Sequence, residues 1–358
     1  MKSITNSYAD EPALWTVEGR GGLHSWKTLG YIPTDDFDPY GVGFFTRSIS
    51  RTVEYAYNDF CIAEMARDMG KTGDAEKYLK RSGNWKNMFD PESRSRLNMT
   101  GSPNVADFVD SGFKGFLQPR YLNGTFGFQE PALCTPGYNF TSCYLNVNGH
   151  ETYEGGSWLY TFAIPHDQAT LVPTLGGPEM YLKRLKYFHD TPGLFYIGDE
   201  PSYVHLFLFH YVNRPGVSAE YAHRYIPSAF NDTVGGLPGN DDSGAMGSFA
   251  ALVMLGLFPM SGQNVYLIIP PFFREVSIKN AVTGKTATIR SKNFDAGYSN
   301  IYIQNATLNG KPYSKAWITH DLFSKGGVLE LELGPKESTV WGRNEKDLPP
   351  SASTHFWK

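Results

Sequence analysis

Over most of its first 260 residues the chain places apolar residues three and four positions apart, the spacing of helices that bury one face. In the stretch ISRTVEYAYNDFCIAEMARDMG, residues 49–70, this pattern ends at Gly70, which favours the left-handed conformation that closes a helix. Another helix is expected over 72–89, and the short link between the two predicts an antiparallel helical hairpin. The same spacing predicts helices over 165–175, 178–189, 201–213, 217–230 and 243–258.

After residue 260 the pattern changes to an alternation of apolar and polar residues, typical of strands with one buried face. VYLIIP, REVSIKN, KTATIRS, NIYIQNATLNG, AWITHD and VLELELG are separated by turn residues, and we interpret them as an antiparallel β region. Residues 1–46 and 90–150 are rich in Gly and Pro and lack a sustained period, which indicates loops and, in the second stretch, short strands. The chain is therefore expected to be an α+β protein with a helical part over 1–260, an antiparallel β domain over 261–342 and a polar tail over 343–358.

Composition narrows the partners that the protein can have. The net charge is −4 and no block of Lys or Arg is present, so neither a nucleic-acid groove nor an anionic membrane surface is expected as a partner. The longest apolar run, residues 247–260, is too short to span a bilayer. Aromatic residues make up 15% of the chain. They fill cores and they also stack on sugar rings, and both interpretations stay open at this point.

Five N-x-S/T acceptor sites and two closely spaced cysteines favour the secretory route. Cys134 and Cys143 lie nine residues apart and could close a small disulfide loop, whereas Cys61 falls in a helical pattern and is expected to be a buried thiol. The start MKSITNSYADEP lacks the apolar core of a signal peptide, so a cytosolic location is the alternative. The acceptor sites are Asn98, Asn123, Asn139, Asn231 and Asn305.

The stretch GGLPGNDDSGAM, residues 235–246, places Asn240, Asp241 and Asp242 between a Gly/Pro turn and an apolar helix. One acid can cap the helix, which has a positive N-terminal end. A second acid beside an apolar core is costly unless it is used, and paired carboxylates at a buried helix start suit general-base work or calcium binding. An EF-hand loop is excluded because Leu252 stands where its last ligand, a Glu, belongs.

Two further stretches carry acids beside helices. In HETYEGGSWLYTFAIPHD, residues 150–167, Glu154 lies between an aromatic residue and two glycines. An aromatic pocket would raise its pKa as a general acid requires, and a surface Glu is the alternative. His166 and Asp167 at the end of this stretch are either a packed ring and a cap or substrate contacts. In YIGDEPSYVHLFLFHYV, Asp199 and Glu200 precede an apolar helix, where capping explains them as well as function does.

The three acidic loops share one geometry, since each leads into a helix or lies beside one. If the helix pairs stack into a toroid, such loops meet at its mouth, where two carboxylates can flank a glycosidic bond. A serine hydrolase is disfavoured because the sequence contains no G-x-S-x-G elbow, and no phosphate-binding or dinucleotide-binding fingerprint occurs either. The acids therefore favour glycoside hydrolysis among the enzyme classes.

Taken together, the stretches resemble glycoside hydrolase family 92, a family of α-mannosidases. The likeness rests on GLPGNDDSGAM with GLFPMSG and YLIIPPFF, and on SRTVEYAYNDFCIAEMARDMGK, RSGNWKNMFDP, YEGGSWLYTFAIPHD and GDEPSYVHLFLFHY, which follow the family's order. It implies the C-terminal part of an (α/α)6 barrel, made of antiparallel helical hairpins, followed by a small antiparallel β-sandwich. It also implies calcium-dependent, inverting removal of terminal α-linked mannose from N-glycans, mannans or glycoproteins, by exo action on α-1,2 linkages.

The resemblance also implies roles for single residues. Glu154 matches the general acid, and Asp241 and Asp242 match the acids that activate water, with Asp242 as the base. Asp199 and Asp242 are the implied calcium ligands, and the ion would bridge two neighbouring hydroxyls of the sugar. The implied substrate contacts are Trp158, His166, Asp167, Glu200 and Asn240.

The sequence also departs from the family's pattern. Asp199 stands where the family has Asn, and the family's E-G-N-x-W-Q-Y block reads EGGSWLY from Glu154 to Tyr160. The chain begins after the family's N-terminal β-sandwich and first barrel helices, so the resemblance implies an N-terminally truncated member with part of the barrel. Two other interpretations stay open: cleavage of the amide bond between the glycan and asparagine, and a remnant that binds mannosides without cleaving them.

Overall fold

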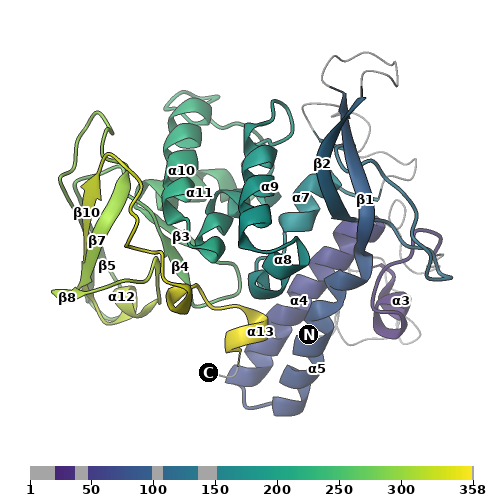
Figure 1. Cartoon of the computed structure of the whole chain (residues 1–358). Coiled ribbons are helices and arrows are strands. Elements are labelled where there is room, and N and C mark those ends of the chain that lie inside the picture. Colours follow the sequence, from purple (N-terminus) through teal and green to yellow (C-terminus); the bar gives the residue numbers. More distant parts are fainter. Residues whose placement is uncertain (1–20, 37–46, 99–107, 136–150, 357–358) are drawn as a thin grey trace. The chain divides into compact units, whose positions relative to one another are not determined.

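The computed structural model describes residues 21–36, 47–98, 108–135 and 151–356. The chain divides into two compact units. The first consists of Met1–Ile164 and Lys186–Tyr196, and the second of Pro165–Leu185 and Ile197–Lys358. Figure 1 labels the helices and strands of both units.

The first unit contains the helical hairpin that the sequence predicts. Helices α4 (Ser48–Asp68) and α5 (Thr72–Ser82) are joined by a turn in which Gly70 has φ 70°, and the 3₁₀ helix η1 (Gly83–Met88) follows (Figure 1). Asp59 of α4 is fully buried and pairs with Arg81 of α5, with 3.0 Å between Oδ1 and Nη2. The indole of Trp26, on helix α3 (Leu23–Thr28), donates a hydrogen bond of 3.0 Å to the same carboxylate. One buried charge thus ties three helices together.

An antiparallel two-stranded sheet follows the hairpin, formed by β1 (Phe89–Asn98) and β2 (Phe108–Leu117). These strands are longer than the short ones expected in this stretch. Register shifts between Asp90 and Arg96 interrupt the regular alternation that would have marked them in the sequence. The sheet packs on helix α7 (Ser157–Phe162), where the ring of Trp158 contacts those of Phe113 and Phe116.

Before its strands, the second unit contains the helices α8 (Gln168–Thr174), η3 (Glu200–Val212), α10 (Pro215–Ala229) and α11 (Ala245–Met254), while α9 (Pro178–Asp190) is divided between the two units. The helix expected over 201–213 is a 3₁₀ helix, in which side chains three residues apart lie above one another. Aromatic stacking joins η3 to the strand after α11, because the ring centroids of Phe207 and Phe258 lie 4.1 Å apart.

Strands make up most of the second unit after α11. Strands β3 (Leu257–Pro259), β4 (Tyr266–Ile268) and β9 (Trp317–Ile318) form one sheet. The strands of the other sheet follow one another in the order β5 (Glu275–Lys279), β6 (Thr286–Lys292), β10 (Gly327–Gly334), β7 (Tyr302–Leu308) and β8 (Lys311–Pro312). Neighbouring strands are antiparallel, as predicted, except that β10 pairs with β6 in parallel. Helix α12 (Asp321–Ser324) precedes β10, and alternate residues such as Ile289 and Leu331 face the core.

The tail over 343–358 contains the 3₁₀ helix η4 (Glu345–Asp347) and helix α13 (Ala352–His355). Helices give way to strands between Met254 and Leu257, close to the expected residue 260, but the compact units divide the chain elsewhere. The domain boundaries at 260 and 342 therefore stay a prediction. Within the described residues, no helix has both the length and the apolar character needed to cross a membrane.

Candidate active site

Two acidic loops of the second unit lie against each other. One runs through Gly198 into η3 and the other runs from Gly239 to the start of α11. A Cβ atom on Gly239 would lie only 2.2 Å from the carbonyl oxygen of Gly198, so this approach requires glycine. The contact brings the pair Asp199-Glu200 into the electrostatic field of the pair Asp241-Asp242. The sequence predicted that three acidic loops meet. The packing of the two glycines brings two of them together, while the loop of Glu154 belongs to the first unit.

Asp241 and Asp242 differ in what they do for the fold. Asp241 Oδ1 accepts a hydrogen bond of 3.0 Å from the backbone N–H of Gly247, in the first turn of α11, so Asp241 satisfies one N–H of that turn, while Gly244 is the N-cap residue. The carboxylate of Asp242 has no hydrogen-bond partner among the described residues. Asp242 has φ 28° and Ser243 has φ 62°, which is a strained backbone of the kind found at functional sites, and Gly244 follows with a positive φ that glycine adopts easily. Both acids are exposed, so the expectation of a buried helix start is wrong.

Glu200 is an acid of the cluster with a shifted pKa. Burial raises its pKa, and the negative charges of Asp242 and Asp241 add to the effect. Its Oε1 is buried and has no hydrogen-bond partner in the described ranges of the chain. Asp199 stands at the N-cap of η3, where its backbone carbonyl accepts hydrogen bonds from Ser202 while its side chain does not cap the helix. Glu200 is thus a partly buried acid with a raised pKa and, among the described residues, no hydrogen-bond partner for Oε1.

Tyr203 belongs to the same cluster and was missed by the sequence analysis. It follows Glu200 by three residues, and in a 3₁₀ helix this spacing places both side chains on one side. Its ring stacks on Phe249 of α11, with 4.1 Å between ring centroids. Burial and the surrounding carboxylates raise the pKa of its hydroxyl. The sequence signal was present in the spacing of Glu200 and Tyr203, but it needed the 3₁₀ geometry to be recognised.

Asn240 lies beside the cluster as a fully polar neighbour. It is exposed, and its side chain has no hydrogen-bond partner within the described part of the chain. An exposed, uncommitted amide next to two carboxylates is free to meet a ligand. Its predicted role as a substrate contact stays a prediction.

Glu154 belongs to the first unit. It is half-buried and has φ 63°, a conformation that non-glycine residues rarely adopt. The turn after it is tight, because a Cβ on Gly156 would lie 2.6 Å from the carbonyl oxygen of Pro131. The backbone around Glu154 is therefore fixed by packing just before α7.

Trp158 does not offer a surface to a sugar. It is 0% exposed, its indole N–H donates to Ser95 Oγ at 2.9 Å, and its ring lies 6.0 Å from that of Phe188 in a stacked arrangement. The predicted substrate contact of Trp158 is therefore wrong, and the residue is core. The sequence could not separate the two roles because the partners of Trp158 are distant along the chain.

His166 and Asp167 are also structural in the described chain. His166 is fully buried, and Asp167 is 5% exposed. Asp167 Oδ1 accepts hydrogen bonds from the hydroxyls of Ser351, at 3.1 Å, and Ser353, at 2.6 Å. Asp167 thus anchors the tail of the chain, and the predicted substrate contacts of both residues are corrected to buried positions.

The implied calcium ion can be tested against the oxygens of the acid cluster. Calcium takes roughly six to eight oxygen ligands from carboxylates, backbone carbonyls and water. The unpartnered Glu200 Oε1 and the repulsion between neighbouring acids fit a cation at this place. Among the described residues, however, no group of three or more His, Cys, Asp or Glu side chains is arranged to hold a metal. A cation here would need backbone, water or substrate oxygens beside the carboxylates.

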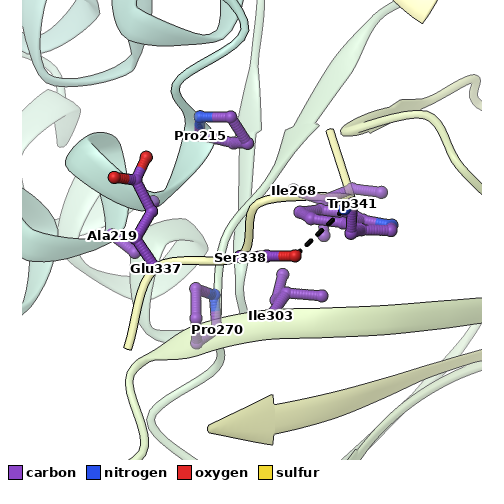
Figure 2. Close-up of a pocket in the computed structure, with 9 residues that line it drawn as sticks. Pro215, Ala219, Ile268, Pro270, Ile303, Glu337, Ser338 and Trp341 are labelled. Atoms are coloured by element: carbon purple, nitrogen blue, oxygen red, sulfur yellow. Dashed lines mark hydrogen bonds between the residues drawn. The ribbon is translucent and has the colours of Figure 1, made fainter. Parts of the chain in front are cut away.

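The crevice shown in Figure 2 is a different place on the second unit. It is lined by Pro215, Gly216, Ala219, Ile268, Pro270, Ile303, Glu337, Ser338 and Trp341. The carboxylate of Glu337 accepts hydrogen bonds of 2.8 and 2.7 Å from Arg214, and Ser338 Oγ accepts one of 3.0 Å from the backbone N–H of Trp341. Its polar side chains are engaged and its other walls are apolar or backbone, so we do not assign chemistry to it.

Comparison with known proteins identifies relatives over nearly the whole chain. The sequence model described as the glycosyl hydrolase family 92 catalytic domain matches residues 1–335. An uncharacterized secreted glycosidase of Arthroderma benhamiae is 55% identical over 341 residues, which are 95% of this chain and 42% of that protein.

Solved structures give the same answer for the fold. A family 92 α-mannosidase of Bacteroides thetaiotaomicron, also solved with mannoimidazole, is 22% identical to this chain, with a TM-score of 0.76. The match covers 98% of this chain and 43% of that protein. An inverting family 92 mannosidase of the same species is 23% identical, with a TM-score of 0.74. The match covers 93% of this chain and 42% of that protein. The predicted fold class is confirmed, and the chain spans less than half the length of these relatives.

Proposed function

The chain belongs to glycosyl hydrolase family 92, and on this premise we propose that it removes terminal α-linked mannose from N-glycans or mannans with inversion. The observation that carries the proposal is the contact between two acidic loops. At this contact the carboxylate of Asp242 has no hydrogen-bond partner among the described residues. Among the structural neighbours is an inverting mannosidase, which supports the same reaction. Exo action on α-1,2 linkages is part of the proposal.

In this proposal Glu154 is the proton donor and Asp242 is the base. Glu154 protonates the oxygen that leaves with the rest of the glycan, while Asp242 takes a proton from the water that attacks the anomeric carbon on the opposite face. Asp241 supports the loop instead of reacting, because its carboxylate is engaged by the N–H of Gly247. Glu200 and Asn240 are the polar groups at the same place that remain free to bind sugar hydroxyls.

Calcium is part of the proposed site. Asp199 and Asp242 would hold the ion, with backbone and water oxygens completing its ligands. When bound, calcium would supply a positive charge to two neighbouring hydroxyls of the sugar. The fold places the proposed calcium ligands near one another, because the contact of Gly239 with Gly198 brings the two acidic loops together.

The test is the release of free mannose from an α-1,2-mannobioside by the purified chain, first with calcium and then with EDTA. We expect calcium-dependent release, with β-mannose as the first anomer seen by NMR. Glu154→Gln and Asp242→Asn should each lower turnover at least ~100-fold. Asp321→Asn, an exposed acid on α12, is the matched control and should leave turnover unchanged. A folded chain that releases no mannose, or a wild-type rate in either active-site variant, contradicts the proposal.

The alternative of glycan–asparagine amide cleavage finds no support at Cys61. Burial raises the pKa of the Cys61 thiol, and a thiol that stays protonated is a poor nucleophile. Cys61 is half-buried and free, where the sequence predicted a buried thiol. Product analysis separates the two reactions, since an amidase would release a whole glycan instead of mannose.

We also propose that the protein is secreted or enters the secretory lumen. Its relative in Arthroderma benhamiae is named as a secreted glycosidase. Cys134 is disulfide-bonded, while Cys143 lies outside the described residues, so the pairing of these two stays a prediction. Among the glycan acceptor sites, Asn139 also lies outside the described residues and Asn98 ends β1. The side chains that are described and exposed are those of Asn123, Asn231 and Asn305.

A further inference from the structure

The hydroxyl of Tyr203 is buried and has no hydrogen-bond partner in the part of the chain that the structure describes. Only 8% of the residue is exposed. Buried hydroxyls nearly always have a partner, because losing water without a replacement destabilises the fold. An unsatisfied group of this kind at an acid cluster points to a partner that the protein itself does not supply.

The ring of Tyr203 is held in place by aromatic packing. It stacks on Phe249 with an interplanar angle of 16°. Phe249 in turn contacts the rings of Phe207, Phe230 and Phe258. The apolar end of the tyrosine is therefore fixed between η3 and α11, and its hydroxyl cannot move far to find a partner elsewhere.

The surroundings of the hydroxyl are acceptors. Glu200, Asp241, Asp199 and Asp242 all act electrostatically on it and, together with burial, raise its pKa. The phenol therefore stays protonated at neutral pH and is available as a donor. Glu200, on the same side of η3, has a buried Oε1 that also lacks a hydrogen-bond partner among the residues that the structure describes. A free donor and a free acceptor thus lie in one cluster without bonding to each other.

We propose that Tyr203 binds a hydroxyl group of the sugar substrate, which accepts a hydrogen bond from Tyr203 Oη and donates one to Glu200. A sugar hydroxyl can accept and donate at the same time, which is what these two groups require. A bare cation could not accept from the phenol. The inference rests on the proposed mannosidase function and adds a substrate-binding residue on η3 that the sequence pattern did not point to.

The test compares two tyrosines of the same helix. Tyr203→Phe keeps the ring on Phe249 and removes only the hydroxyl, so we expect kcat/KM for an α-mannoside to fall roughly 10- to 100-fold. The melting temperature should stay the same or rise, because an unsatisfied buried group is removed. Tyr211→Phe is the control: its hydroxyl is also buried and unpartnered, but burial alone perturbs it, and turnover should not change.

Deoxy sugars identify the contact. We would test a panel of α-mannosides that each lack one hydroxyl. For one of them, the kcat/KM of the wild type should fall by about the same factor as the Tyr203→Phe substitution causes on the complete sugar. On that substrate the variant should lose little more, since variant and substrate remove the same hydrogen bond. If the Tyr203→Phe substitution lowered kcat/KM by the same factor on every deoxy sugar as on the complete sugar, the two changes would be independent and the assignment would be overturned.

The remaining outcomes separate the inference from the function on which it rests. If the wild type cleaves no α-mannoside, the proposed function fails and the role of Tyr203 falls with it. If the wild type is active and Tyr203→Phe equals it in kcat/KM, only the inference is overturned. A clear fall in the melting temperature of Tyr203→Phe would likewise overturn it, because the hydroxyl would then have a partner within the fold.

Discussion

Asp241 and Asp242 are adjacent in the sequence, but the fold relies on one of them only. Asp241 accepts the N–H of Gly247, whereas Asp242 has no hydrogen-bond partner in the described chain and adds to the charge that raises the pKa of Glu200. We therefore expect Asp241→Ala to lower the melting temperature by about 1–3 °C, because an N–H of the first helical turn loses its acceptor, and Asp242→Ala not to lower it. Calorimetry in EDTA measures both, and equal losses would contradict the division of roles.

At the scale of residues, the sequence could indicate which acids gather but not which side chains are buried. Asp199, Glu200, Asp241 and Asp242 share a loop-to-helix pattern, and the structure does bring them together. Trp158 failed as a substrate contact because its burial depends on partners that are far along the chain. Asp167 and His166 failed for the same reason, since the tail that covers Asp167 is more than 180 residues away.

At the scale of elements, the α4–α5 hairpin depends on a buried ion pair. Asp59 is completely buried, and it accepts hydrogen bonds from Arg81 and from the indole of Trp26. Asp59→Asn keeps the shape but leaves the Arg81 guanidinium, 13% exposed, without its counter-charge. We expect a loss of about 3 kcal/mol in the free energy of unfolding of this unit, as for other broken buried pairs.

Chemical unfolding followed by tryptophan fluorescence measures this loss. The matched control is Asp68→Asn on the same helix, where the side chain is 73% exposed and the substitution should change stability little. A loss below the uncertainty of the control would show that the hairpin does not depend on the Asp59–Arg81 pair.

Elements with a strong local period were predictable, and those set by distant contacts were not. The hairpin 49–89 and the alternating strands after 260 followed directly from their patterns. The β1–β2 sheet was underestimated because its register shifts break the alternation. The 3₁₀ form of η3 and the parallel pairing of β10 with β6 leave no mark in the sequence, since they depend on packing and on chain path.

At the scale of the molecule, one buried histidine links the helical and strand parts of the second unit. His210 lies on η3, and its Nδ1 is 3.0 Å from Ser218 Oγ of α10. Its Nε2 is 3.0 Å from the carbonyl oxygen of Ile268 on β4, and a carbonyl can only accept. In the neutral ring with hydrogen on Nε2, that hydrogen is donated to Ile268 and Nδ1 accepts from Ser218. The carbonyl oxygen of Phe207 also lies 3.0 Å from Nδ1 and raises the pKa of the ring, but burial has the larger effect. A charged ring would have to be desolvated among them.

This histidine should make the second unit sensitive to acid. Burial lowers the pKa of His210 to about 4, whereas an unfolded histidine titrates near ~6.5. Between these values the unfolded chain binds a proton that the folded chain does not, so stability is lost as the pH falls from about 6.5 towards 4, by about 3 kcal/mol in total. Burial also lowers the pKa of His223, which adds in the same direction.

Urea unfolding at pH 7 and pH 4.5 should show this loss in the wild type and a smaller one in His210→Gln, whose amide can still donate to Ile268 but does not titrate. An equal loss in both proteins would mean that other groups govern the acid sensitivity.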